Sequence, residues 1–262
     1  MSKTILITGS TDGIGLLTAK TLKAAGHTVL LHGRSQTKLD AAAAELGGDV
    51  QTYLADLSDM KDVSALGQSI LADHKNLDVL INNAGIYKTA NPMVNGHDVR
   101  FLVNTLAPLL LTRLVLPIIP EDGRVINLSS AAQADVDTAA IAGTRTVGDF
   151  DAYAQSKLAL IVWTEDLARS YPKGPVFVAV NPGSLLASKM VKEGFGVAGN
   201  DLSIGSNILC AAATDAAFAT ASGKYFDNDA GKFAPPHASI LNAAKSQEIL
   251  QQIETTLASL MD

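Results

Sequence analysis

Apolar runs of strand length alternate along this chain with longer segments in which apolar residues recur at helical spacing. The short runs predict strands at residues 4–8, 29–31, 50–54, 78–81, 124–128, 175–180 and 224–226. The periodic segments predict helices at residues 14–25, 36–46, 59–73, 97–116, 153–170, 203–220 and 239–260. Strand and helix therefore alternate over most of the chain.

The predicted strands are apolar on both faces, which is typical of a parallel sheet covered by helices on its two sides. Right-handed crossovers then give an α/β fold with a doubly wound parallel sheet of about seven strands, the Rossmann fold. No linker-like stretch divides the chain, so residues 1–262 are expected to form a single domain. Irregular stretches at 86–97, 131–152 and 184–202 are expected to be the substrate loops.

Composition and charge exclude several classes of protein. Hydrophobic residues make up 47% and charged residues 18% of the 262 positions, which is ordinary for a globular domain. The net charge of −6, without a basic cluster, argues against binding to nucleic acid or to an anionic membrane. The single Cys210 cannot form an intramolecular disulfide, which favours a reducing, cytoplasmic compartment.

Targeting segments, membrane spans and metal sites are not expected either. No charged and apolar leader precedes the first predicted strand. The longest apolar stretch, residues 106–120, is interrupted by Thr112, Arg113 and prolines, and falls short of the roughly 20 clean residues of a spanning helix. The five scattered histidines show no metal-ligand spacing, so no metal site is predicted.

A glycine-rich turn links the first predicted strand to the first predicted helix. Its residues are Gly9, Ser10, Thr11, Asp12, Gly13, Ile14 and Gly15. Glycines permit a tight turn and a close backbone approach, and the helix N-terminus offers free N–H groups to a diphosphate. The turn therefore predicts a dinucleotide site, although an ordinary strand–helix turn is the alternative reading.

The residues after the second predicted strand bear on which dinucleotide binds. An acidic residue there would hold the ribose 2′-hydroxyl, but this chain has Gly33, Arg34 and Ser35. The guanidinium and the hydroxyl suit a 2′-phosphate, so we predict NADP(H) over NAD(H). Two observations weigh against this prediction: Arg34 could instead cover the adenine, and Asp12 would repel a nearby phosphate.

Candidate reacting groups gather at the carboxyl ends of the predicted strands, where doubly wound sheets bind ligands. Tyr153 and Lys157 are four residues apart at the start of a helix, so both project from one face. Ser129 and Ser130 end the fifth strand, and residues 82–85 end the fourth. The polar Asn104 lies among apolar residues of a helix, which calls for a specific role.

With these residues in place, the chain resembles the short-chain dehydrogenase/reductase family, in its single-domain, NADP(H)-using branch. The motifs that carry the resemblance are Thr8-Gly9-x-x-x-Gly13-Ile14-Gly15, Asp56-Leu57, Asn82-Asn83-Ala84-Gly85, Asn104, Ser130, Tyr153-x-x-x-Lys157 and Asn181-Pro182-Gly183. Gly33-Arg34, the long interval between Ser130 and Tyr153, and residues 224–227 make it similar to the retinol-dehydrogenase-like, carbonyl-reducing members.

The resemblance implies a role for each matching residue. Tyr153 would protonate the carbonyl oxygen, Lys157 would lower the pKa of Tyr153 and bind the nicotinamide ribose, and Ser130 would hydrogen-bond the substrate. Asn104 would hold a water in a proton relay. The implied cofactor contacts are Asp56 and Leu57 at adenine, Asn83, Ala84 and Gly85 at the ribose, and Pro182, Gly183, Leu185 and Ser188 at the nicotinamide.

The chain departs from the family pattern in two places. Residues 131–152 make the interval before Tyr153 unusually long, and Ala187 stands where the family carries a threonine, with Ser188 next to it.

Elementary energetics is consistent with a tyrosine acid. Lowering a phenol pKa from near 10 to near 7 takes about 4 kcal/mol. An ammonium about 4 Å away in a medium of effective dielectric constant near 20 supplies about 4 kcal/mol. One lysine is therefore of the right size to make a tyrosine a proton carrier at neutral pH.

The sequence thus predicts an oxidoreductase that transfers a hydride between NADP(H) and an apolar carbonyl or alcohol substrate. The alternatives are a catalytically vestigial NADP(H)-binding sensor or scaffold, and a lyase or epimerase on the same fold. A homo-oligomer formed through helices 99–117 and 153–170 is also expected, because the segment around Trp163 is apolar nearly all round.

Overall fold

The computed structural model describes residues 2–47, 49–187, 192, 196 and 198–262. Its centre is an eight-stranded sheet in the order β10-β9-β8-β7-β4-β1-β2-β3. The strands are β1 (Thr4–Ile7), β2 (Thr28–Gly33), β3 (Thr52–Leu54), β4 (Val79–Asn82), β7 (Arg124–Leu128), β8 (Val176–Asn181), β9 (Lys224–Asp227) and β10 (Lys232–Ala234). All pairings are parallel except that of β10 with β9.

The predicted doubly wound sheet in one domain is therefore confirmed. The seven predicted strands are present, and β10 is an eighth, antiparallel edge strand that the sequence analysis did not predict. Chain order reverses between β1 and β4, since β2 and β3 lie on one side and β4, β7, β8 and β9 on the other. In such sheets, the crevice at the carboxyl ends of the two central strands is the usual ligand site.

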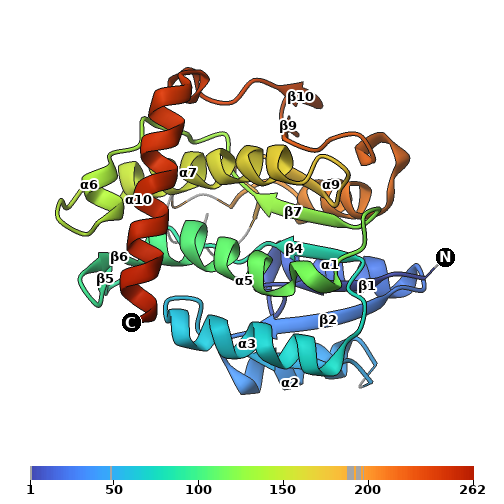
Figure 1. Ribbon diagram of the computed structural model, residues 1–262. Helices are drawn as coiled ribbons and strands as arrows, with labels where there is room; N and C mark the ends of the chain where they lie inside the picture. Colours follow the sequence, from blue (N-terminus) through green and yellow to red (C-terminus); the bar gives the residue numbers. More distant parts are fainter. Residues whose placement is uncertain (1, 48, 188–191, 193–195, 197) are drawn as a thin grey trace.

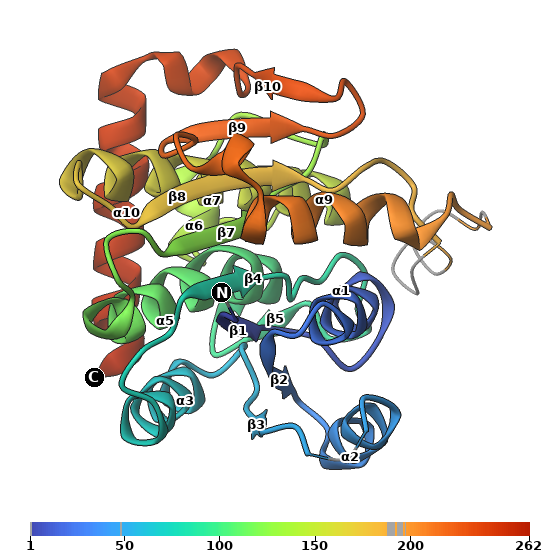
Figure 2. The same ribbon diagram turned by 90° about the vertical axis from the view of Figure 1, so that its right-hand side faces the viewer.

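Two layers of helices cover the sheet, as Figure 2 shows. One layer contains α1 (Gly13–Ala24), α2 (Gln36–Glu45) and α9 (Leu202–Thr214), and the other α3 (Met60–Asp73), α5 (Ala107–Val115) and α7 (Asp149–Ser170). Two apolar clusters result, one on each face of the sheet. Strand side chains alternate between them, for example Ile5 in one and Leu6 in the other, which explains why the strands are apolar throughout.

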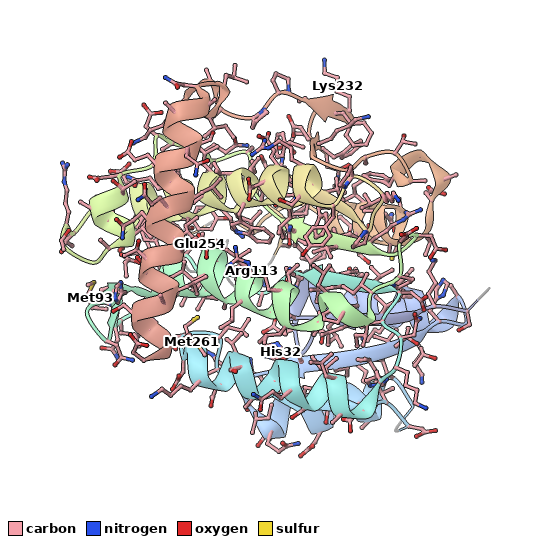
Figure 3. The ribbon with its side chains drawn as sticks, viewed as in Figure 1. His32, Met93, Arg113, Lys232, Glu254 and Met261 are labelled. Atoms are coloured by element: carbon pink, nitrogen blue, oxygen red, sulfur yellow. The ribbon has the colours of Figure 1, made fainter. Side chains whose placement is uncertain are left out.

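The C-terminal helix α10 (Ala243–Met261) crosses the outside of the layer that contains α7 and α5 (Figure 1). Arg113 of α5 pairs with Glu254 of α10, at 2.8 Å for one of its two hydrogen bonds (Figure 3). Trp163 of α7 is only 1% exposed within the single chain. The apolar second side of α7 is thus covered by the same chain, which removes the reason for expecting an oligomer there, and the homo-oligomer stays a prediction.

The irregular segments hold short elements that apolar periodicity did not predict. Residues 86–97 lead into a hairpin of β5 (Met93–Val94) and β6 (His97–Asp98), and residues 131–152 hold α6 (Thr138–Ile141) and the first turn of α7. The predicted helix 97–116 is α4 (Val99–Phe101), a π-helical turn η1 (Leu102–Leu106), α5 and a 3₁₀ turn η2 (Leu116–Ile118). The predicted helix 203–220 ends in a 3₁₀ turn, η3 (Ala216–Phe218), and the predicted helix 239–260 begins with another, η4 (Ala238–Leu241).

The segment Val99–Ile118 is long and apolar enough to cross a membrane by length and composition alone. However, 61% of its most apolar window is buried inside the fold, as in a core helix. Length and composition are therefore weak evidence for a span, and the expectation of none stays a prediction.

Candidate active site

A cleft of about 530 Å³ lies at the carboxyl edge of the sheet, where β1 and β4 meet. Many of the residues predicted to bind the cofactor line it. They are Gly9, Thr11, Asp12, Gly13, Ile14, Gly15, Gly33, Arg34, Ser35, Asp56, Leu57, Asn83, Ala84, Gly85 and Pro182, and Tyr153 and Lys157 join them. The topology therefore brings segments that are far apart in sequence to one place.

The glycine-rich turn leaves no room for a side chain at Gly15, which packs against Gly9 of the same turn and against Asn83 after β4. A Cβ on Gly15 would lie 2.5 Å from the Gly9 carbonyl oxygen and 2.4 Å from the side-chain nitrogen of Asn83. Gly9 and Gly13 have φ of 63° and 55°, a backbone conformation that favours glycine. The capping residue of α1, Asp12, makes no side-chain cap bond, so the first N–H groups of the helix stay open toward the cleft.

Ser10 is the exception among the predicted turn residues. Its side chain is fully buried, and its hydroxyl accepts a hydrogen bond of 3.0 Å from the backbone N–H of His32. Its own backbone N–H donates to the His32 carbonyl at 3.0 Å. Both groups fasten the turn to β2, and Ser10 is not among the residues that line the cleft, while its contact with the cofactor stays a prediction.

His32 of β2 holds the glycine-rich turn in place through a hydrogen bond to Gly9. Nothing in the sequence pattern predicted this role. Its Nδ1 accepts from the Gly9 N–H at 3.1 Å, so its Nε2 carries the proton and donates to the Ala55 carbonyl at 3.2 Å. Burial lowers the pKa of His32 to about 4. The ring is therefore neutral at physiological pH, in the tautomer that both hydrogen bonds require.

Positive charge gathers at the adenosine end of the cleft. Arg34 is exposed there and makes no hydrogen bond or ion pair with any described residue. Ser35 caps α2 without a side-chain cap bond, so its hydroxyl is also available. Lys38, one turn into α2, pairs with Asp12 at 3.4 Å and neutralises the carboxylate that counted against a phosphate.

Several residues after β3 and β4 that line the cleft also make hydrogen bonds within the protein. The amide of Asn83 donates to the carbonyls of Thr8 and Gly9 at 2.8 and 3.1 Å, and the Ala84 N–H donates to the Thr8 hydroxyl at 3.0 Å. These bonds tie the end of β4 to the glycine-rich turn. Asp56 accepts from the N–H and hydroxyl of Ser58, which fixes the wall of the cleft after β3.

Tyr153 and Lys157 line the cleft, and Ser130 lies beside Tyr153 without being among the lining residues. The Tyr153 phenol is hydrogen-bonded to the Ser130 side chain. The ammonium of Lys157 lies 5.8 Å from the centre of the Tyr153 ring and donates a hydrogen bond of 2.6 Å to the Leu128 carbonyl. The Tyr87 ring lies against Tyr153, with ring centres 5.3 Å apart.

The Tyr153 phenol is not acidic in this structure, because its pKa is raised above the usual value. Burial raises the pKa of Tyr153, and the nearby Tyr87 acts in the same direction, while the hydrogen bond from Ser130 lowers it. Burial also lowers the pKa of Lys157, to about 8. The ammonium is directed at a carbonyl, so the phenol stays protonated at neutral pH.

Asn104 has its side chain fully engaged. Its Oδ1 accepts from the Ile86 N–H at 2.8 Å, and its Nδ2 donates to the Ile86 carbonyl and the Ser156 hydroxyl, both at 3.0 Å. The residue four positions ahead is Pro108, which has no N–H, so the Asn104 backbone carbonyl lacks its α-helical donor. The water that the resemblance implies at Asn104 stays a prediction.

The segment after β8 contributes less than the resemblance implied. Pro182 lines the cleft, whereas Gly183 and Leu185 do not, and Leu185 is 45% exposed with φ of 51°. The predicted contact of Ser188 with the cofactor lies outside the described residues.

Tyr87 and Lys88, in the predicted substrate loop 86–97, also line the cleft, and so does Lys38, which was not predicted as a site residue. Lys38 lies on the exposed side of α2, where a lysine gives no signal of its own. Within the described residues, no three His, Cys, Asp or Glu side chains form a group that could hold a metal ion.

Comparison with known proteins identifies the family. The family model for short chain dehydrogenases matches residues 3–195. The chain belongs to the short chain dehydrogenase family. The matched range includes the glycine-rich turn, Ser130, Tyr153 and Lys157.

Similar curated proteins of this family include retinol dehydrogenases. Retinol dehydrogenase 12 of Bos taurus is 35% identical over 208 residues, which are 74% of this chain and 64% of that protein. Retinol dehydrogenase 13 of Homo sapiens is 33% identical over 200 residues, or 69% and 58% of the two chains. This short chain dehydrogenase thus spans less than two thirds of their length.

Solved structures agree with the fold over most of the chain. A protein from Mycobacterium paratuberculosis superposes with a TM-score of 0.80 and 25% identity, covering 98% of this chain and 93% of that one. A short chain dehydrogenase from Escherichia coli CFT073, complexed with NADPH, gives a TM-score of 0.72 and 26% identity, covering 86% and 96%.

Proposed function

We propose that this short chain dehydrogenase is an NADPH-dependent reductase of apolar ketones or aldehydes, with Tyr153 as the proton donor. The observation that carries the proposal is the contact of Tyr153 with Ser130 and Lys157 beside a cleft built for a dinucleotide. The similarity to retinol dehydrogenases and to an NADPH complex supports the same class of reaction.

The residues of the cleft fit a dinucleotide phosphate. The glycine-rich turn leaves N–H groups open at the start of α1, and Gly15 has no room for a Cβ. Arg34 and the Ser35 hydroxyl are free to meet a 2′-phosphate, and Lys38 adds a second cation. This charge favours NADP(H), while an adenine-covering role for Arg34 would serve NAD(H) equally.

The protein's part in the reaction is to hold and deliver a proton. When bound, the cofactor supplies hydride chemistry. Ser130 hydrogen-bonds the Tyr153 phenol and is placed to hydrogen-bond a substrate oxygen beside it. Tyr153 is kept neutral by burial, which is the protonation state that a donor to a reduced carbonyl needs.

Lys157 then has two tasks in this proposal. Its buried ammonium stabilises the phenolate that remains after proton delivery. It also lines the cleft in which a nicotinamide ribose would lie, so it could bind that ribose. Ile86, Tyr87 and Val103 give the reacting end of the cleft an apolar wall, which favours an apolar substrate.

The test is turnover with NADPH and a panel of aldehydes and ketones, followed by the loss of nicotinamide absorbance. Tyr153→Phe should abolish turnover while binding NADPH with nearly unchanged affinity. A variant that turns over as fast as the wild type would overturn the role of Tyr153. A broad panel without any turnover would instead favour the vestigial sensor or scaffold, which the intact set of Ser130, Tyr153 and Lys157 argues against.

A further inference from the structure

Arg100, a residue outside every motif of the site, is the most deeply buried cation in the described part of the chain, with 1% of its surface exposed. Its guanidinium makes a two-pronged contact with Asp98, with Nε to Oδ1 at 2.7 Å and Nη2 to Oδ2 at 2.5 Å. Its Nη1 donates to Asp149 at 2.5 Å and to the Tyr87 carbonyl at 3.4 Å. One buried cation is thus shared by two carboxylates and a carbonyl.

The three partners of Arg100 come from three separate segments. Tyr87 lies in the loop after β4, Asp98 ends the β5–β6 hairpin, and Asp149 begins α7. Asp98 also accepts from the Arg100 backbone N–H at 2.9 Å and so caps α4. Arg100 therefore joins the loop, the hairpin and the first turn of α7 at one point.

Two of these segments carry the rings that meet at the reacting end of the cleft. Tyr153 is one helical turn after Asp149 in α7, and its ring packs on that of Tyr87 at 5.3 Å between centres. The contact of Arg100 with Asp149 on one side and with Tyr87 on the other fixes the distance between the two backbones that bear these rings.

We propose, on the basis of the function proposed above, that Arg100 with Asp98 and Asp149 is a positioning cluster that holds Tyr87 against Tyr153 and so sets the burial of the proton donor. A buried ion pair of this kind is costly to desolvate and gives little net stability, so a positional role accounts for it better. Displacing a reacting group by about 1 Å can cost up to 10²-fold in rate.

The burial of Arg100 opposes its charge, but the hydrogen bonds and charges of Asp98 and Asp149 outweigh it and raise its pKa. The guanidinium therefore stays charged. The groups around the phenol are Lys157 on its own helix, Ser130 after β7, and Tyr87 with Lys88 in the loop, where the Lys88 ammonium lies 5.9 Å from the centre of the Tyr87 ring.

Asp149 offers a mild way to test the cluster, because its side chain is 51% exposed and its removal leaves the core intact. Asp149→Ala cuts the tie between α7 and Arg100. Asp151→Ala is the matched control, since Asp151 is an acidic residue of the same exposed first turn and makes no hydrogen bond or ion pair among the described residues. Both variants remove one negative charge near the start of the helix.

The phenolate absorbance of each variant is measured as a function of pH. The absorbance of the same variant carrying Tyr153→Phe is subtracted, which leaves the ionisation of Tyr153 alone. We expect Asp149→Ala to lower the pKa of Tyr153 by about one unit more than Asp151→Ala, because water enters between the two rings. This titration needs no turnover, so it is independent of the proposed reaction. Equal shifts in the two variants would overturn the positioning role.

Kinetics provides a second readout. With an active wild type, Asp149→Ala should lower kcat about tenfold with little change in the dissociation constant of NADPH, whereas Asp151→Ala should keep both. Asp149→Glu, which retains the carboxylate, should recover part of kcat. Wild-type rates in Asp149→Ala would contradict the inference, while an inactive wild type would contradict the proposed function alone.

Discussion

The Lys157 ammonium donates its hydrogen bond to the carbonyl of Leu128, at 2.6 Å, and not to the phenol of Tyr153. The charge is held at the end of β7, beneath the place where the substrate and the nicotinamide ribose are proposed to lie. A buried cation therefore lies next to a neutral phenol. This arrangement is ready to stabilise a phenolate as soon as a proton has left.

A buried cation with a lowered pKa should reduce stability, so Lys157→Met is expected to stabilise the protein while abolishing turnover. The pKa falls from 10.5 to about 8 on folding, which corresponds to about 3 kcal/mol. The bond to Leu128 offsets about 1–2 kcal/mol of this. Chemical unfolding at pH 7 should therefore show a net gain of about 1 kcal/mol in the free energy of unfolding of the variant.

The same lysine gives a pH dependence with a definite sign. Between pH 8 and 10.5 the unfolded chain binds more protons than the folded one at this residue, so wild-type stability should rise with pH in that window. The rise should be absent from Lys157→Met. A variant that is less stable than the wild type at pH 7, with the same slope, would contradict the buried-cation account.

His32 should make the protein sensitive to acid. Its pKa is 6.5 unfolded and about 4 folded, so the stability that depends on its neutral ring is lost as pH falls between these values. The loss at pH 4 is about 3 kcal/mol. In His32→Gln, an amide that can accept from Gly9 and donate to Ala55 without titrating, this part of the pH dependence should disappear from thermal unfolding curves.

Arg34 and Lys38 should separate the two nicotinamide cofactors. Arg34→Ala is expected to weaken NADPH about tenfold or more and to leave NADH nearly unchanged, because the guanidinium is proposed to meet the 2′-phosphate. Lys38→Ala should also weaken NADPH more than NADH, since it removes the cation that neutralises Asp12. Fluorescence titration of both cofactors gives the comparison, and an equal loss of NADPH and NADH in Arg34→Ala would assign Arg34 to the adenine.

Two glycines of the turn should respond to alanine for different reasons. At Gly13 nothing lies within 4 Å of an added Cβ, so the cost of Gly13→Ala is the strain of φ 55°, about 1 kcal/mol. At Gly15 the added atom would meet the Gly9 carbonyl and Asn83, so Gly15→Ala should cost more stability and also displace the turn. NADPH affinity should fall further in Gly15→Ala than in Gly13→Ala.

The strands of the parallel sheet could be predicted from the sequence because each is an unbroken apolar run next to a turn signal. Examples are the runs that contain the buried Ile5 and Val178. Strand β10 escaped prediction because Lys232–Ala234 is a three-residue, half-exposed edge with no apolar run. The π-helical turn at Leu102–Leu106 also has no periodic signature. It depends on Pro108 and on the bonds of Asn104 to Ile86, which only the tertiary structure brings together.

At the site, motif residues were predictable and their supports were not. The glycine-rich turn, Tyr153 and Lys157 are recognised by spacing, but Ser10 points into the protein because His32 lies beneath it. The apolar second side of α7 was read as a subunit contact, since nothing in its own sequence says that α10 covers it. A partner that is distant in sequence, such as His32 or α10, leaves no signal in the segment that it contacts.

The most direct test of the central claim follows the hydride itself. The wild-type protein is incubated with an aldehyde that it consumes and with NADPH carrying deuterium at the transferable position of the nicotinamide. The account predicts that mass spectrometry finds one deuterium on the carbinol carbon of the product, and that Tyr153→Phe forms no labelled alcohol although it still binds NADPH. Alcohol without deuterium from the wild type, or labelled alcohol from Tyr153→Phe at the wild-type rate, would contradict it.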